Sequence, residues 1–434
     1  MSVSGEQVME ASLDELFAIA EQKSRKIRVS ITQHEASVEN VKAAKSQLLP
    51  DLNLSLSGSY IGTPTLMSRG FSSSGTTTVP YAIGVGEVNN GSQPTPHWGN
   101  DFVAQVTQVI YSGGAISSGI KLAKQREKMA QLDVEKNRLE VRFLLTGYYL
   151  EICKLSNQLK VVEQNISLAE QLLKTMRARY AEGTALKNDI TRYEYQLQSL
   201  ELGKTKLADA IDIVNYQLIE TLQLPEDTKL IPKDIVNPTD NHNEGIWQSQ
   251  ASTENISIRQ AELAADMSQT EVRAVRSALF PNISLMIQNR LFGPYVNDLI
   301  PVDANINTWF VGVNIQYDLG NLWRKNHDIK RARINARQSA DQVSLVREEI
   351  DKALHANYMN YQTSQVEVET QRKQVALADE HYQVTQNRYE KGLALLTDML
   401  DASNMKLSAD IDLVNSQINH IYNYYKLKYI TGTL

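Results

Sequence analysis

The sequence predicts an α+β membrane protein, a tandem-repeat protomer of a trimeric 12-stranded β-barrel continuous with a long α-helical coiled-coil barrel. Three observations predict this fold class. The chain carries two copies of one plan, each copy contains two strands of about ten alternating residues, and each contains helices too long for a globular domain.

Composition excludes several classes of protein. The 434 residues carry a net charge of −6, which argues against a nucleic-acid-binding protein, because such proteins usually present a basic face. The single cysteine, Cys153, allows no disulfide framework within one chain. No run of 18 apolar residues occurs, so membrane-spanning helices are excluded. Residues 1–6 lack the basic start and apolar stretch of a signal peptide, and we expect the leader to be absent from this numbering.

Two motifs recur in the same order in the two halves of the chain. Residues 47–52 read QLLPDL, and residues 278–283 read ALFPNI, 231 positions later. Residues 179–183 read RYAEG, and residues 388–392 read RYEKG, 209 positions later. Recurrence in this order indicates a tandem repeat.

Each repeat reads helix, proline, strand, loop, strand, very long helix, glycine turn and long helix. We expect the first repeat over 1–224 and the second over 251–434. An inter-repeat linker or equatorial segment is expected over 225–250, because this segment has few periodic apolar residues and contains Pro225, Pro232 and Pro238.

Four segments alternate between apolar and polar residues, as strands with two different faces do. They are expected at about 51–61, 101–112, 282–292 and 308–318. About ten residues is the length of a tilted strand that crosses a bilayer, and apolar-out, polar-in alternation is typical of outer-membrane strands. From alternation alone, a soluble antiparallel sheet with one wet face is an equal alternative.

Aromatic residues at the strand ends favour the membrane interpretation. We expect one rim to hold Tyr60, Phe102, Phe292 and Trp309, and the other to hold Tyr111, Phe280 and Tyr317. Four strands cannot close a barrel, and open edges in lipid would leave backbone groups unsatisfied. Eight strands leave no pore, whereas the twelve strands of a trimer can hold one. The long loops at 62–99 and 293–307 would face the exterior.

Two long helices are expected at about 115–181 and 321–390, where there is no proline and almost no glycine. Each would be about 100 Å long. Apolar residues recur at steps of three and four, which predicts coiled-coil seams that build a wall. Pro50 and Pro281 are expected to convert a helix into a strand, because the residue before a proline avoids helical angles.

Together, the tandem repeat, the LPDL and FPNI junctions and the RYxxG turns followed by aspartate resemble the TolC family of outer-membrane efflux proteins. The resemblance covers nearly the whole chain. It implies a homotrimer in the lipid of a Gram-negative outer membrane, with its helical tube in the periplasm. It also implies a periplasmic adaptor (membrane fusion) protein and an inner-membrane transporter as partners, and a function as the exit duct of a tripartite efflux or type I secretion system.

The resemblance also suggests roles for the hairpin tips. Gly183 and Gly392 would form the periplasmic turns, and the residues expected there or at the adaptor-docking face are Arg179, Tyr180, Asp189, Arg388 and Tyr389. In the family, two acidic residues one helical turn apart line the closed periplasmic aperture, which implies a gate formed by Asp398 and Asp401. An arginine that contributes to the family's lock is replaced here by Ala394.

No catalytic set, cofactor motif or metal-ligand spacing emerges, so an enzyme is not expected. Two other functions stay open from the residues. A periplasmic adaptor would carry one helical hairpin between split β-rich domains, rather than two complete repeats. A soluble coiled-coil scaffold would have no reason to place aromatic residues at both ends of four strands.

Overall fold

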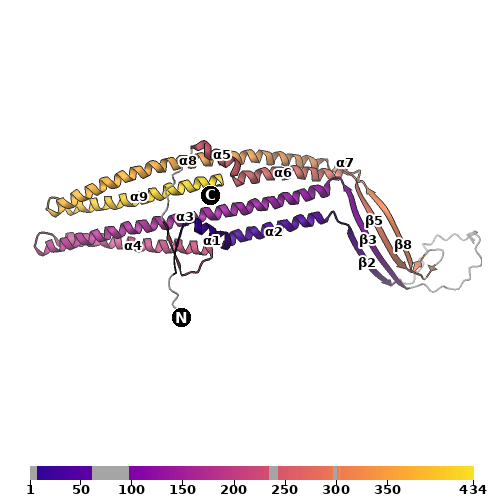
Figure 1. Ribbon diagram of the computed structural model, residues 1–434, viewed down its shortest axis with the longest axis horizontal. Coiled ribbons are helices and arrows are strands. Elements are labelled where there is room, and N and C mark those ends of the chain that lie inside the picture. Colours follow the sequence, from indigo (N-terminus) through magenta and orange to yellow (C-terminus); the bar gives the residue numbers. More distant parts are fainter. Residues whose placement is uncertain (1–6, 61–96, 234–242, 297–300, 303) are drawn as a thin grey trace, which may run out of the picture. The chain divides into compact units, whose positions relative to one another are not determined.

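The computed structural model describes residues 7–60, 97–233, 243–296, 301–302 and 304–434 (Figure 1). In chain order, its elements are β1 (Gln7–Ala11), α1 (Leu13–Lys23), α2 (Arg25–Ser46), β2 (Asp51–Tyr60), β3 (Trp98–Ser112), α3 (Ala115–Ala181), α4 (Lys187–Leu222), β4 (Thr228–Pro232), α5 (Glu244–Glu254), α6 (Ile256–Arg276), a 3₁₀ turn (Ser277–Leu279), β5 (Asn282–Gly293), β6 (Tyr295–Val296), β7 (Pro301–Val302), β8 (Ile306–Gln316), α7 (Asn321–Arg324), α8 (Asn326–Glu390) and α9 (Leu396–Thr431).

The chain divides into two compact units, and each expected repeat contributes to both. The helical unit comprises 1–40, 122–269 and 334–434, and the sheet unit comprises 41–121 and 270–333. Among the described residues, no helix has both the length and the apolar character needed to cross a membrane.

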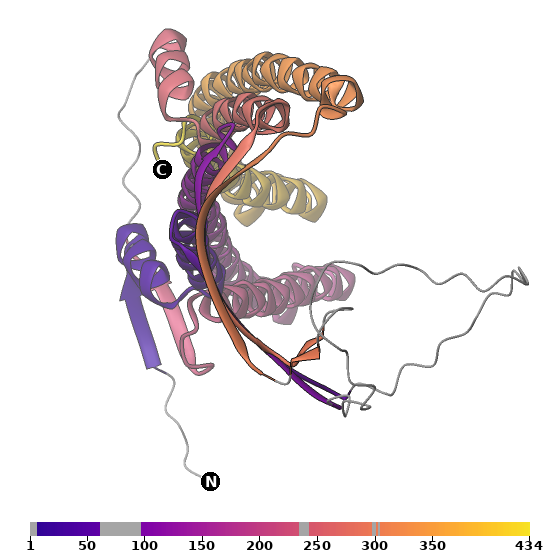
Figure 2. The same ribbon diagram turned by 90° about the vertical axis from the view of Figure 1, so that its right-hand side faces the viewer.

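In the sheet unit, four strands form one antiparallel sheet in the order β2-β3-β5-β8. Figure 2 shows this sheet as a curved ribbon. Pro50 and Pro281 directly precede β2 and β5. Phe280, before the second proline, has the extended angles φ −113° and ψ 156°, as the steric demand of proline requires.

Two long antiparallel hairpins, α3–α4 and α8–α9, make up most of the helical unit (Figure 1). The expected seam of α3 is buried: Val162, Ile166 and Met176 are 0–8% exposed. They belong to an apolar cluster that also includes Tyr382 of α8 and Met399 of α9. The two hairpins therefore share a core close to their turns, as apolar positions spaced by three and four residues allow.

Several expected helices are interrupted. The first helix of each repeat is two helices, separated at Ser24 and at Asn255. Asn255 caps α6, because its Oδ1 accepts the N–H of Ile258 while its Nδ2 donates to the carbonyl of Ile430. The long helix expected over 321–390 is broken at Lys325, between α7 and α8.

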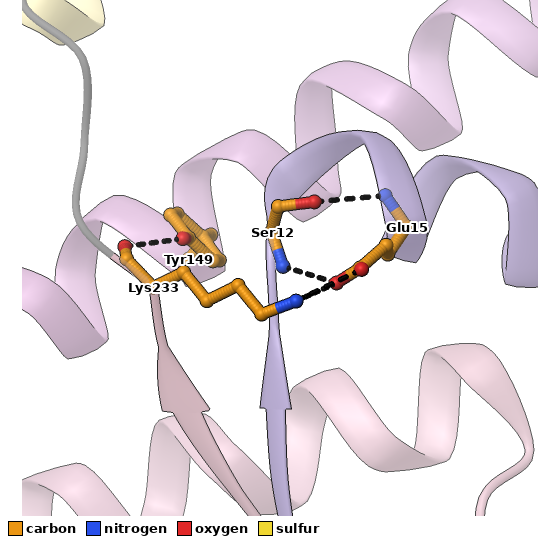
Figure 3. Close-up of polar contacts among 4 residues, drawn as sticks. All are labelled: Ser12, Glu15, Tyr149 and Lys233. Carbon is orange, nitrogen blue, oxygen red and sulfur yellow. Dashed lines mark hydrogen bonds and ion pairs between the residues drawn. The ribbon is translucent and has the colours of Figure 1, made fainter.

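The segment expected as a linker, 225–250, is more regular than its prolines suggest. It contains β4 and the beginning of α5, and β4 pairs in parallel with β1. The end of this pairing is held by polar contacts (Figure 3). Lys233 Nζ lies 2.9 Å from Glu15 Oε1, and Tyr149 donates its hydroxyl proton to the carbonyl of Lys233 at 2.8 Å. Glu15 also accepts the N–H of Ser12, completing a capping box at the start of α1.

Of the expected exterior loops, the first falls almost wholly at 61–96, outside the described residues. In the second, β6 pairs with β7 in an antiparallel hairpin, and residues 297–300 and 303 also lie outside the described part.

Candidate functional site: the sheet faces and the hairpin tips

One face of the four-stranded sheet is apolar and exposed. Residues directly paired across strands share a face, so the register aligns Leu52, Val106, Ile287 and Val311 in one row. Leu52 is 77% exposed and Val311 is 57% exposed. Soluble monomers rarely leave such a contiguous apolar surface uncovered, so this face is suited to lipid or to another protein.

The opposite face is polar. One row across it aligns Asn53, Gln105 and Gln288 and ends at Phe310 of β8, so this face is mainly polar with an aromatic ring at its β8 edge. Near the end of the sheet where β2 ends and β3 begins, Arg290 forms two hydrogen bonds with Asp101, from Nε at 2.9 Å and from Nη2 at 2.8 Å. This fork geometry fixes both side chains on the polar face.

The register corrects the expected rim of aromatic residues. Phe292 is paired with Asp101 and lies on the polar face, where the guanidinium of Arg290 stands 4.6 Å from its ring centroid. Phe292 is two residues from Arg290 on β5, and residues two apart on a strand share a face. Phe292 is therefore separated from the apolar-face aromatic residues with which it was grouped.

Tyr60 and Phe102 lie on the apolar face toward this end of the sheet, and Trp309 lies on the same face in a more central row, with Leu54 and Ala104. The sequence interpretation missed Trp98, which is 77% exposed and packs edge-on against Tyr60 with ring centroids 5.3 Å apart. Extending the alternation of β3 backwards from Phe102 by four residues would have found it.

At the other end of the sheet, Tyr111, Phe280 and Tyr317 are 43–49% exposed. Tyr111 reaches the apolar face only because β3 contains a bulge between Val109 and Tyr111, which places Tyr111 opposite Ile283. Without this extra residue, strict alternation would turn its ring to the polar face.

Both hairpin tips have the same backbone geometry. Gly183 and Gly392 have φ values of 73° and 72°, the left-handed region that favours glycine. In each tip, the N–H of the residue after the glycine bonds to a carbonyl five residues earlier, Thr184 to Arg179 at 2.9 Å and Leu393 to Arg388 at 2.8 Å. This is the Schellman motif, which ends a helix and lets the chain reverse.

Side chains from both tips meet around Tyr389. Arg179 Nη1 donates to the carbonyl of Tyr389 at 3.0 Å, and its guanidinium lies 5.6 Å from the centroid of the tyrosine ring. Burial, followed by the negative charge of Asp189, raises the pKa of Tyr389. By contrast, Tyr180 is 46% exposed, and Arg388 donates to the carbonyl of Leu393 within its own turn.

Asp398 and Asp401 are both exposed, one helical turn apart at the start of α9. Asp398 Oδ2 accepts the N–H of Leu395 at 3.0 Å and so satisfies a free donor at the helix N-terminus. Asp401 has no hydrogen bond or ion pair within the described part of the chain. The structure therefore gives Asp398 a local role and leaves the carboxylate of Asp401 available.

Comparisons with known proteins match this architecture. The profile described as "Outer membrane efflux protein" matches residues 16–210 and 247–433. TolC of Vibrio cholerae serotype O1 is 20% identical over 433 residues, 98% of this chain and 91% of that protein. The alignment with TolC of Salmonella enteritidis, at 22% identity over 190 residues, spans only 39% of that relative's length.

Solved structures resemble the fold. VceC, an outer membrane protein of Vibrio cholerae, superposes with a TM-score of 0.77 at 15% identity, over 97% of this chain and 96% of that one. CusC, whose structures are described in terms of folding and transmembrane channel formation, superposes with a TM-score of 0.81 at 15% identity. The superposition covers 99% of this chain and 95% of CusC.

Proposed function

The chain belongs to the outer membrane efflux protein family, a family of outer-membrane exit channels for efflux systems, and we propose that three copies of this chain assemble into such a channel. The observation that carries the proposal is the single sheet with an exposed apolar face and a polar opposite face. In a closed barrel, the apolar face contacts lipid and the polar face lines water.

The order of the strands supports closure between copies. β2 and β8 are the two edges of the sheet, and each has one unpaired side in the single chain. Because four antiparallel strands alternate in direction, β8 of one copy runs antiparallel to β2 of the next. Closure then satisfies the edge groups that lipid cannot, and three copies supply twelve strands.

The mass and conductance of the purified protein test this assembly. In detergent, we expect a protein mass three times the 48.8 kDa of the chain. In planar bilayers, we expect discrete conductance steps. A chain that remains monomeric and soluble without detergent would refute the channel and favour a coiled-coil scaffold.

The long hairpins would form the periplasmic part of the duct, with the tips at Gly183 and Gly392 facing a periplasmic adaptor that connects to an inner-membrane transporter. Exposed Tyr180 and Arg388 provide contact surface at these tips. The contacts of Arg179 with Tyr389 hold the two tips of one copy together, which would give the adaptor a single surface.

We further propose that Asp398 and Asp401 line the periplasmic opening, which in a trimer would gather six carboxylates. Rings of acidic side chains favour cations in a pore. Replacing both by asparagine should reduce cation selectivity and block by divalent cations in single-channel recordings. The matched control is the same change at Asp209 and Asp212, an exposed pair with the same spacing on α4. Equal effects of the two double variants, or none from the first, would contradict the gate.

A further inference from the structure

The segments that join the helices to the sheet carry an excess of unpaired positive charge. Within 41–51, 112–121, 270–281 and 317–333, six exposed basic side chains have no ion pair in the described structure: Lys45, Lys121, Arg273, Arg276, Lys330 and Arg333. The same segments hold two exposed acidic side chains without an ionic partner, Asp51 and Glu271. We call these six basic side chains the basic collar. Their positive charge contrasts with the net charge of −6 of the whole chain.

Helix stability does not account for half of the collar. Lys45, Arg273 and Arg276 lie in the last turns of α2 and α6, where the helix dipole favours positive charge. Lys121, Lys330 and Arg333, however, lie beyond the first turn of α3 and α8, where the dipole no longer favours either sign of charge. The helix dipole therefore does not explain these three basic residues.

Exposed apolar side chains lie beside the collar. In the short segment around α7, Leu319, Leu322 and Trp323 are 57%, 51% and 68% exposed. Tryptophan is favoured at the boundary between lipid tails and headgroups, and leucine favours the tails. This segment adjoins β8, whose apolar face ends at Ile315.

The α7 segment is held in place rather than loose. Arg324 Nη2 bonds to both carboxylate oxygens of Asp318, at 3.0 and 2.9 Å. Asn321 Nδ2 donates to the carbonyl of Ala278 at 3.1 Å, which connects the segment to the other helix-to-strand junction of the second repeat. Leu319, Leu322 and Trp323 therefore project from a segment whose position is fixed by these hydrogen bonds.

We propose that the basic collar and the apolar α7 segment form a binding surface for anionic phospholipid headgroups of the periplasmic leaflet. This inference rests on the proposed function, since it requires the sheet to stand in a membrane. Leu319, Leu322 and Trp323 enter the leaflet, while the lysine and arginine side chains reach the phosphate groups. The occupant is an anionic lipid because the surface combines charge complementarity with continuity to the apolar face.

The test uses the full-length channel reconstituted in vesicles that contain a phospholipid with brominated tails. Bromine quenches tryptophan on contact, and the signal of Trp323 is the difference between each chain and its Trp323→Phe version. Co-flotation and conductance are measured first, so a failure of the channel proposal is recognised separately. We then compare brominated phosphatidylglycerol with brominated phosphatidylcholine at equal mole fraction.

At low salt, we expect phosphatidylglycerol to be enriched around Trp323 about fivefold, the factor given by one basic residue near an anionic surface. Enrichment should disappear in 1 M salt, where the screening length is about 3 Å. The combined Lys121→Gln, Lys330→Gln and Arg333→Gln variant, which removes half of the collar, should reduce the enrichment. A variant with the same change at the exposed Lys174, Lys206 and Lys373 should leave it unchanged.

Two results would overturn the inference in a channel that inserts and conducts. One is equal quenching by the two lipids in the unsubstituted chain. The other is a collar variant that changes the ion selectivity of the pore while lipid quenching stays the same, which would place these charges along the water-filled path.

Discussion

Replacing Gly113 by alanine should destabilise the sheet unit much more than the same change at the adjacent Gly114. Both glycines have a positive φ, 61° and 89°, so alanine at either position pays the left-handed backbone cost of about 1–2 kcal/mol. Their surroundings differ. A Cβ on Gly113 would lie 2.5 Å from the carbonyl oxygen of Ser277 and 2.7 Å from Cβ of Phe280, whereas a Cβ on Gly114 would meet nothing closer than 3.7 Å.

The close approach at Gly113 determines how much stability the alanine substitution removes. Carbon atoms pack best at about 3.5–4.0 Å, so the end of β3 and the junction before β5 must separate by roughly 1 Å. Neither contact atom can rotate away, since one is backbone and the other is a Cβ. Overpacking of this kind costs about 1–3 kcal/mol. We therefore expect about 2–5 kcal/mol for Gly113→Ala and about 1–2 kcal/mol for Gly114→Ala.

Guanidinium unfolding of the detergent-solubilised protein, followed by tryptophan fluorescence, measures the difference. The midpoint should fall further for Gly113→Ala, with an unchanged slope. The reasoning is refuted if the two variants shift the midpoint equally, because the backbone conformation alone would then account for both.

Three further outcomes are expected. Arg179→Gln should weaken the contact between the hairpin tips at Tyr389 by roughly 1–2 kcal/mol, seen as faster amide hydrogen exchange in both turns, and unchanged exchange would contradict this. The hydrogen bond from Lys233 lowers the pKa of Glu15, so the stability it contributes is present above the ordinary carboxyl pKa and is lost as pH falls through the lowered value. Lys233→Met should therefore reduce the thermal midpoint at pH 7 and flatten its decline toward acid pH, and parallel pH profiles would argue against the ion pair. Burial raises the pKa of Cys153 to about 12, so a maleimide should label it by mass spectrometry only after unfolding, and rapid labelling of the folded protein would oppose its placement in the core.

Local patterns in the sequence predicted the strand and turn positions closely. Alternation located β2 at Asp51–Tyr60 against an expected 51–61, and the RYxxG motifs coincide with the turns at Gly183 and Gly392. These features depend on neighbours within a few residues, so periodicity and glycine chemistry are sufficient to find them. The arrangement of three chains and the gate at Asp398 and Asp401 stay predictions.

Contacts between distant segments could not be found in this way. The pairing of β1 with β4 joins residues that are far apart in the sequence, such as Val8 and Lys229, so a pattern of neighbouring residues does not predict it. Likewise, the recurrence of RYxxG does not indicate that Arg179 from the first tip bonds to the second tip while Arg388 stays within its own turn.

The sequence by itself determined the repeat, the approximate positions of the strands and hairpin turns, and the two-faced character of the sheet, because each depends on spacing along the chain. Only the tertiary structure decided the face of Tyr111, because the bulge in β3 is not visible in the alternation. A bulge of one residue brings Tyr111 to the apolar face. Phe292 instead follows the regular alternation of β5 to the polar face, where it lies beside the hydrogen-bonded pair of Asp101 and Arg290. A single extra residue in a strand reverses every side chain beyond it, and pairing with the neighbouring strand is what reveals that residue.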